Sequence, residues 1–168
     1  MRAGGMRRIL WGVVILGCIA VGGAARAEDA ADAVILTLDG ALADGAGPVR
    51  FTLGDLEAVG VSRLITSTPW DKAPVVFSGV RLSDLLRHVR ATGTVLKVVA
   101  LNDFAAALPL SDVRSYEPLL ATRRDGEPLA VRNKGPLFVV YPFDAHPDLR
   151  NEVIRARSVW QVKSITVE

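Results

Sequence analysis

Residues 77–86 read Phe77-Ser78-Gly79-Val80-Arg81-Leu82-Ser83-Asp84-Leu85-Leu86. Within and just after this stretch, apolar residues recur at the spacing i, i+3, i+4, i+7, at Leu82, Leu85, Leu86 and Val89. That spacing places them on one face of a helix, while Asp84, Arg87 and His88 fall on the other face. The sequence therefore predicts a short amphipathic helix over residues 82–89.

Short strands are predicted on both sides of this helix. Apolar runs, alternating or continuous, indicate strands at residues 34–38, 49–53, 95–101, 104–110, 137–141 and 160–167. Residues 119–122 and 129–131 flank Asp125-Gly126 and predict a hairpin. Short helices are expected at residues 56–59, where Thr52 to Asp55 form a capping sequence, and at residues 148–157. Many strands with few helices indicate an α+β fold.

The N-terminal segment has the pattern of a secretory signal peptide. Three arginines precede an apolar run over residues 9–21, and Ala25-Arg26-Ala27 supplies a small-residue exit. The run is too short for a membrane span, which takes about 20 apolar residues. We expect residues 1–27 to be removed and residues 28–168 to form one periplasmic domain. The alternative is a lipoprotein attached through Cys18, but the apolar residues 19–21 favour a continuing signal core.

The charge balance and the cysteine content limit which functions and which kind of fold are expected for the chain. The chain has 20 Lys+Arg and 18 Asp+Glu, but four of the arginines lie in residues 1–27, so residues 28–168 carry a net charge of −2. The basic balance therefore belongs to the targeting segment, and it does not support nucleic-acid binding. No cysteine follows Cys18, so the exported chain has no disulfide and depends on its core. Roughly 140 residues suffice for one such core and argue against a second domain.

Six fragments in a fixed order carry a family resemblance. Residues 77–86 are similar to a W-x-G-V-P-L-x-x-L-L segment, with Phe77 for the aromatic residue and Arg81 for the proline. N-D-F, D-G, R-x-K-G-P, Y-P and W-Q-x-K-x-I then follow, at residues 102–104, 125–126, 132–136, 141–142 and 160–165. The series resembles the molybdopterin-binding (sulfite-oxidase-type) domain. The resemblance implies a mixed β-sheet or barrel core with few short helices.

One departure from that family bears on function. The resemblance implies a molybdenum-ligating cysteine upstream of the 77–86 segment, where this chain has Ile65-Thr66-Ser67-Thr68-Pro69-Trp70. A neutral hydroxyl cannot replace a thiolate as the soft, anionic ligand of the metal. The hypothesis is therefore a non-catalytic site without metal, which binds a tetrahydropterin-like pterin in preference to molybdopterin.

The resemblance also extends to small exported proteins that bind reduced pterins. It implies a partner, the periplasmic part of a membrane protein such as a cyclic-di-GMP cyclase or phosphodiesterase, to which pterin status is relayed. The alternative function is a molybdopterin-dependent oxidoreductase, or a subunit of one, whose missing ligand comes from elsewhere. A third hypothesis is an interaction protein whose pocket is vestigial.

Aromatic and polar residues are the candidates for the pterin site. Trp70 and Trp160 offer rigid indole faces for stacking, although two core tryptophans are the alternative. Thr66 and Thr68 belong to the same polar loop as Trp70. The Asn102-Asp103 pair can hydrogen-bond the amino and N3–H edge of a pterin, with an Asx turn as the alternative.

The remaining candidates lie in the last third of the chain. Arg132 and Lys134 beside Gly135 suit a phosphate or carbonyl oxygen, and a solvated basic turn is the alternative. The hydroxyl of Tyr141 reaches the site or caps the core. His88 and His146 lie far apart without further ligands at metal spacing, which argues against a metal site.

Overall fold

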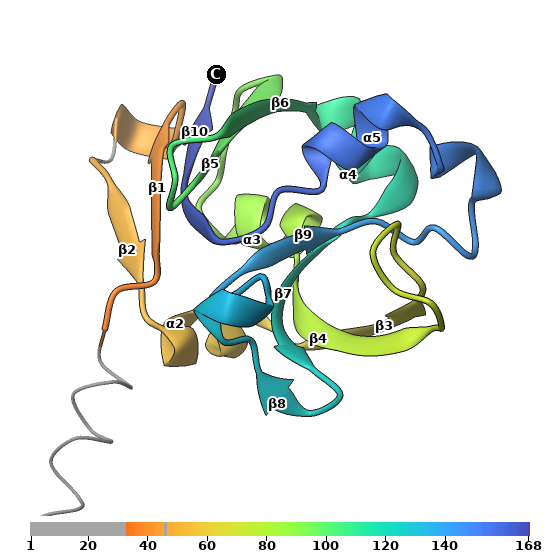
Figure 1. Ribbon diagram of the computed structural model, residues 1–168. Helices are drawn as coiled ribbons and strands as arrows, with labels where there is room; N and C mark the ends of the chain where they lie inside the picture. Colours follow the sequence, from red (N-terminus) through yellow and green to blue (C-terminus); the bar gives the residue numbers. More distant parts are fainter. Residues whose placement is uncertain (1–32, 46) are drawn as a thin grey trace, which may run out of the picture.

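Two β-sheets form the framework of the domain (Figure 1). The computed structural model describes residues 33–45 and 47–168. The predicted signal segment 1–27 and Cys18 lie outside the described residues. Within the described part of the chain, no helix is both long and apolar enough to cross a membrane.

The first sheet is mixed and contains the two ends of the domain. Its strand order is β2 (Val49–Phe51), β1 (Leu36–Gly40), β10 (Val162–Val167), β5 (Val95–Ala100) and β6 (Ala105–Pro109). The pair β1–β10 is parallel, and the other pairs are antiparallel. Leu38 lies opposite Ile165 in this parallel pair, and both side chains are fully buried. The N-terminal strand is thus fixed between β2 and the C-terminal strand.

The second sheet is antiparallel. Its strands run in the order β3 (Ser62–Thr66), β4 (Val75–Arg81), β7 (Leu119–Arg124) and β8 (Glu127–Pro128), and β9 (Phe138–Val140) pairs with β7. Asp125 and Gly126 both have positive φ and turn β7 into β8, which confirms the predicted turn, but the second arm of the hairpin is residues 127–128 and not the predicted 129–131. A bridge between Phe138 and Trp160 connects β9 to the segment that leads into β10.

Four short helices join the strands in the described residues: α2 (Leu53–Val59), α3 (Leu82–His88), α4 (Leu110–Tyr116) and α5 (Glu152–Arg157). Short 3-10 turns, η1 (Ala43–Gly45), η2 (Val131–Asn133) and η3 (Pro147–Leu149), complete the connections. The Thr52 hydroxyl accepts a hydrogen bond from the Asp55 N–H and the Asp55 carboxylate accepts one from the Thr52 N–H, which confirms the predicted cap of α2.

The leucine face of α3 enters the main core, as its spacing predicted. Leu82 and Leu85 are fully buried among residues of both sheets. A second, smaller cluster is centred on Phe77 and Phe138, and Trp70 and Trp160 pack against its edge. The α+β class is confirmed. Helix α4 was not predicted, because Pro109 ends β6 and Leu110 begins the helix inside a single apolar run.

Candidate functional site

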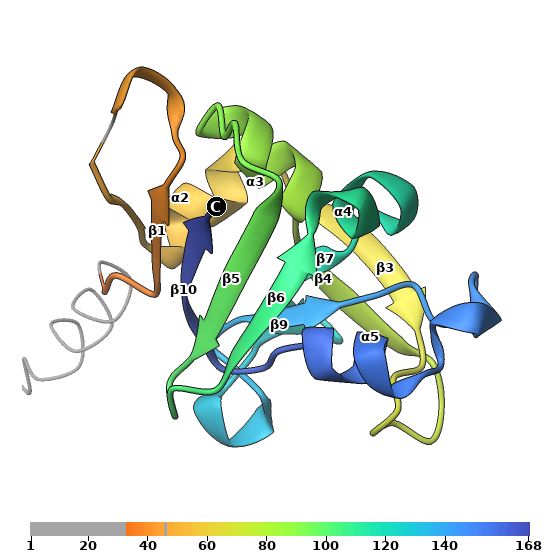
Figure 2. The ribbon, with the colours of Figure 1, turned by 90° about the horizontal axis from the view of Figure 1, so that it is seen from above.

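A cleft of about 390 Å³ opens where the two sheets meet α5. Four segments line it: the β3–β4 loop, the β5–β6 turn, α5, and the residues between α5 and β10. Figure 2 shows α5 beside β6, with β9 beneath them. The lining residues are Trp70, Ala100, Asn102, Phe104, Glu152, Arg155, Ala156, Ser158, Val159 and Trp160. The volume lies within the range of small-molecule sites, about 300–1,000 Å³.

Two indole rings form one wall of this cleft. The rings of Trp70 and Trp160 meet edge to face, with centroids 4.9 Å apart. Lys134 Nζ lies 5.4 Å from the Trp160 ring centroid and 5.8 Å from that of Trp70. Arg155 Cζ lies 6.0 Å from the Trp70 ring centroid. Both cations lie within reach of cation–π attraction to the indoles; Arg155 also lines the cleft, and Lys134 is not among the lining residues.

The loop between β3 and β4, residues 67–74, is called the Trp70 loop, and polar contacts on two sides hold it in place. The Ser67 N–H donates to the Asp144 carboxylate (2.6 Å), which also pairs with Arg150 (2.6 Å). The Ser67 hydroxyl also donates to Asp144 (2.5 Å), and the hydrogen bonds from this hydroxyl, from the Ser67 N–H and from Arg150 lower the pKa of Asp144. On the other side, Thr68 donates to Asp71, whose carboxylate pairs with Arg124 at 2.8 Å. The loop is therefore ordered by the protein's own contacts.

Thr66, the last residue of β3, and Thr68 are both buried, and their hydroxyls have hydrogen-bond partners within the protein. The Thr66 hydroxyl donates to the Ser67 carbonyl (3.1 Å) and accepts from the Asp144 N–H (3.1 Å). The Thr68 hydroxyl accepts from the Trp70 N–H (3.3 Å). Neither residue lines the cleft. Their side chains shape the loop that presents Trp70.

The β5–β6 turn divides the Asn102-Asp103 pair. Asn102 lines the cleft, while its side-chain oxygen accepts the Phe104 N–H at 3.2 Å, as in an Asx turn. Asp103 has a φ of 65° and forms an ion pair with Lys163 (2.6 Å). The hydrogen bond from Lys163 lowers the pKa of Asp103. Asn102 thus faces the cleft, and Asp103 is not among its lining residues.

The Arg132–Gly135 segment contributes one side chain to the aromatic wall. Arg132 is exposed in η2, whereas Lys134 lies over both indoles. Gly135 is buried, and its N–H donates to the Ala130 carbonyl at 2.9 Å. A Cβ atom at Gly135 would lie 2.0 Å from the Leu129 carbonyl oxygen. The glycine therefore permits a close backbone approach inside the protein, and its N–H already has a partner.

Tyr141 lies in the core and not in the cleft. Its hydroxyl donates to Asp112 Oδ2 at 3.0 Å, and Arg157 donates to the same oxygen at 2.8 Å. Burial, and then the negative charge of Asp112, raise the pKa of Tyr141 well above its usual value. Of the two readings of Tyr141 left open by the sequence, the structure places the hydroxyl in the core.

Several cleft residues were missed from the sequence. Arg155 and Glu152 lie on α5 and contact each other at 3.4 Å, and Phe104 remains 49% exposed at the cleft. The helix itself was expected within residues 148–157, but it buries only Ile154. With one buried residue there is no apolar stripe to fix its orientation, so no sequence pattern indicates which side chains face the cleft.

The residues of this region do not fit a thiolate-ligated molybdenum centre. Residues 19–168 contain no cysteine, and the hydroxyls of the Trp70 loop are engaged in hydrogen bonds. Among the described residues, no group of three His, Cys, Asp or Glu side chains could hold a metal ion.

Two sheets with short helices and a cleft at their junction are the architecture of a sulfite-oxidase-type molybdopterin-binding domain. Residues 42–145 match the family described as the oxidoreductase molybdopterin binding domain, and the chain belongs to that family. This finding confirms the fold and family expected from the sequence. No curated protein matches the chain.

A solved structure shares the fold. The chain is similar to the sulfane dehydrogenase SoxCD from Paracoccus pantotrophus, with a TM-score of 0.58 and 18% sequence identity. The match covers 79% of this chain and 37% of that chain. The chain therefore spans well under half the length of that neighbour, and the likeness at this identity is one of fold.

Proposed function

We propose that this chain is an exported, non-catalytic pterin-binding protein that relays pterin status to a membrane signalling partner. The observation that carries the proposal is the cleft whose wall is formed by Trp70 and Trp160, beside Asn102. Family membership supports a pterin-type ligand. The absence of cysteine from residues 19–168 supports binding without molybdenum chemistry.

The cleft offers each part of a pterin a suitable contact. The fused ring is flat and aromatic, and the indole faces can stack on it at small entropic cost. The Asn102 amide can donate to, or accept from, the polar edge of the ring. Lys134 and Arg155 add positive charge, which suits the carbonyl oxygen or an anionic substituent.

The partner is inferred from the family resemblance. The chain resembles small exported pterin-binding proteins, and the resemblance implies that pterin status is relayed to a membrane enzyme of cyclic di-GMP metabolism, a role that we propose for this chain. The relay requires a surface that differs between the free and ligand-bound protein. The β5–β6 turn suits this role, because Asn102 lines the cleft and the neighbouring Leu101 is 45% exposed at the surface.

Tryptophan emission provides a direct test. After residues 1–27 are removed, Trp70 and Trp160 are the two tryptophans of the chain, and both line the cleft. Titration of the dialysed, exported protein with tetrahydropterin should quench this emission with micromolar affinity, and Trp70→Ala should weaken binding by about 1–3 kcal/mol. Tyr116→Ala, at an aromatic residue away from the cleft, should leave the affinity unchanged. No saturable signal up to millimolar ligand would refute the proposal.

A molybdopterin-dependent oxidoreductase subunit is the second candidate function. The family description and the dehydrogenase title of the structural neighbour favour it. The metal ligand would then come from another chain. Elemental analysis of protein purified from its native host separates the two candidates, because stoichiometric molybdenum supports the oxidoreductase and pterin without molybdenum supports the binding protein.

A further inference from the structure

The backbone at Trp70 is connected to β7 by a short chain of polar contacts. The Trp70 N–H donates to the Thr68 hydroxyl (3.3 Å), which itself donates to Asp71 Oδ2. The other oxygen of Asp71 pairs with Arg124 Nη1 at 2.8 Å. The Asp71 N–H also donates to the Thr68 carbonyl (3.0 Å), which closes the loop on itself.

Because they are buried, the side chains in this series of contacts depend on one another for their positions. The Asp71 side chain is 7% exposed and Thr68 is 1% exposed. A carboxylate with so little access to water depends on its protein partners, and removing one partner leaves an uncompensated buried charge. Asp71 therefore holds its position only while Arg124 and Thr68 hold theirs.

Arg124 is itself held in place. It lies at the end of β7, next to the Asp125-Gly126 turn, and Asp125 accepts a hydrogen bond from the Val76 N–H (3.1 Å). The Arg124 guanidinium lies 6.0 Å from the ring centroid of Phe77. Phe77 contacts Phe138, and Phe138 contacts Trp70, each at 5.9 Å between centroids. Arg124 is thus connected to Trp70 through intermediate residues, by polar contacts and also by aromatic contacts.

We infer that Arg124, acting through Asp71 and Thr68, is the positioning residue that sets the orientation of Trp70 in the cleft. The inference rests on the proposed function for its ligand, a pterin, but the orientation of Trp70 can be measured without any ligand. Neither Arg124 nor Asp71 lines the cleft, so both would act through the indole.

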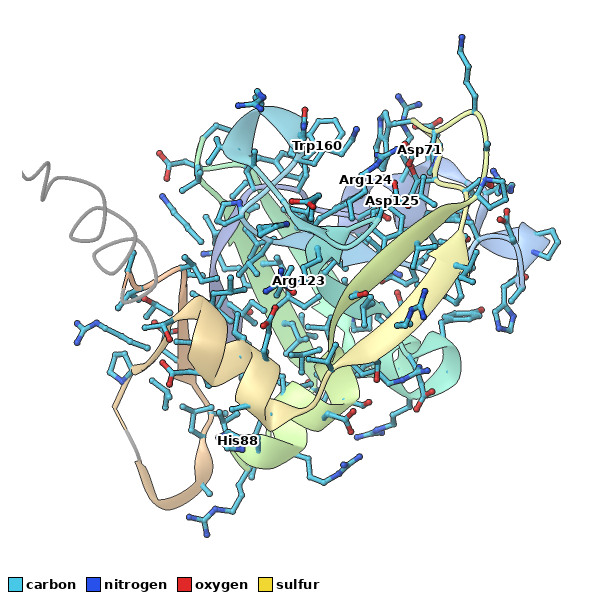
Figure 3. All side chains as sticks on the ribbon, turned by 90° about the horizontal axis from the view of Figure 1, so that it is seen from below. Asp71, His88, Arg123, Arg124, Asp125 and Trp160 are labelled. Carbon is cyan, nitrogen blue, oxygen red and sulfur yellow. The ribbon has the colours of Figure 1, made fainter. Side chains whose placement is uncertain are left out.

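The neighbouring residue supplies a matched control. Arg123 forms an ion pair of similar length (2.7 Å) with Glu57 of α2, and its side chain is 32% exposed against 36% for Arg124. Consecutive strand residues point to opposite faces of a sheet. Figure 3 shows Asp71 close to Arg124 and Arg123 apart from them. Arg123→Gln and Arg124→Gln therefore each remove an arginine–carboxylate ion pair, but only the second removes the connection to Trp70, together with a longer contact between Arg124 and Asp125 (3.7 Å).

The experiment follows the indole N–H resonances of the exported protein by NMR, with Trp160→Phe used to assign them. Arg124→Gln should shift or broaden the Trp70 resonance and weaken tetrahydropterin binding about 3- to 30-fold. Asp71→Asn should act in the same direction, and Arg124→Lys, which keeps the charge, should restore both signals in part. Arg123→Gln should lower the melting temperature without moving either signal.

The outcomes separate the two proposals. An unchanged Trp70 resonance in folded Arg124→Gln, or an equal change in Arg123→Gln, would overturn the positioning role. A shifted Trp70 resonance in Arg124→Gln, in a protein whose wild type binds no tetrahydropterin, would support the positioning role and overturn the proposed function. If Arg124→Gln does not fold, the same readings are taken from Asp71→Asn.

Discussion

Replacing Tyr141 by phenylalanine removes one oxygen atom from the interior and leaves the ring in place. The Tyr141 hydroxyl donates to Asp112 Oδ2 at 3.0 Å, and Tyr141 and Asp112 are 0% and 8% exposed. A hydrogen bond to a charged group contributes about 1.5–3 kcal/mol to stability, and the loss of a buried partner adds a desolvation cost. Because Arg157 still pairs with Asp112, we expect a loss in the lower half of that range, about 2 kcal/mol.

Urea unfolding, followed by far-UV circular dichroism, measures this loss. With a slope of about 2 kcal/mol per molar urea, the unfolding midpoint should fall by about 1 M. Tyr116→Phe is the matched control, because its hydroxyl lies 3.4 Å from Asp148 at the surface. That change should cost less than about 0.5 kcal/mol. Equal shifts in the two variants would refute the reasoning.

The same variant also tests the location of the site. Tyr141 does not line the cleft, so Tyr141→Phe should leave tetrahydropterin affinity unchanged at temperatures where the protein is folded. A fall in affinity without a fall in stability would return Tyr141 to the binding site and contradict its placement in the core.

Two further predictions concern packing and pH. Gly135→Ala should destabilise the protein by about 1–3 kcal/mol, because the new Cβ would lie 2.0 Å from the Leu129 carbonyl oxygen. Gly54→Ala, where the new Cβ meets nothing closer than 3.8 Å inside α2, should instead stabilise it by about 0.5–1 kcal/mol. If both variants melt at the temperature of the wild type, both expectations are wrong. The pKa of Asp144 is lowered from 3.8 by hydrogen bonds from Ser67 and Arg150, so its stabilising effect is present above pH 3.8 and lost as pH falls through the lowered value. Asp144→Asn should therefore flatten the dependence of the melting temperature on pH below about 4, and a profile parallel to that of the wild type would argue against this role.

Features set by neighbouring residues were predictable. The leucine spacing of residues 82–89 identified α3, Thr52 and Asp55 identified the cap of α2, and Asp125-Gly126 identified the β7–β8 turn. Each depends on a helical period, a local hydrogen bond or a backbone preference that a few consecutive residues determine. The six ordered fragments then indicated the family.

Pairing between distant strands was not predictable in the same way. The parallel pair β1–β10 joins the first and last strands of the domain, and no local sequence pattern in either strand indicates which strand it pairs with. Strands β3 and β4 were also not predicted as strands. Strand β4 pairs on one side with β3 and on the other with β7, which lies far along the chain.

The family, the local elements, the absence of a thiolate after Cys18 and the candidate aromatic residues follow from the amino-acid sequence alone. Only the tertiary structure placed Trp70 and Trp160 in one wall, directed Asn102 and not Asp103 to the cleft, and moved Tyr141 into the core. The physical reason is that a residue's type and its neighbours set its chemistry, whereas its surroundings are set by contacts between segments that only the folded chain brings together.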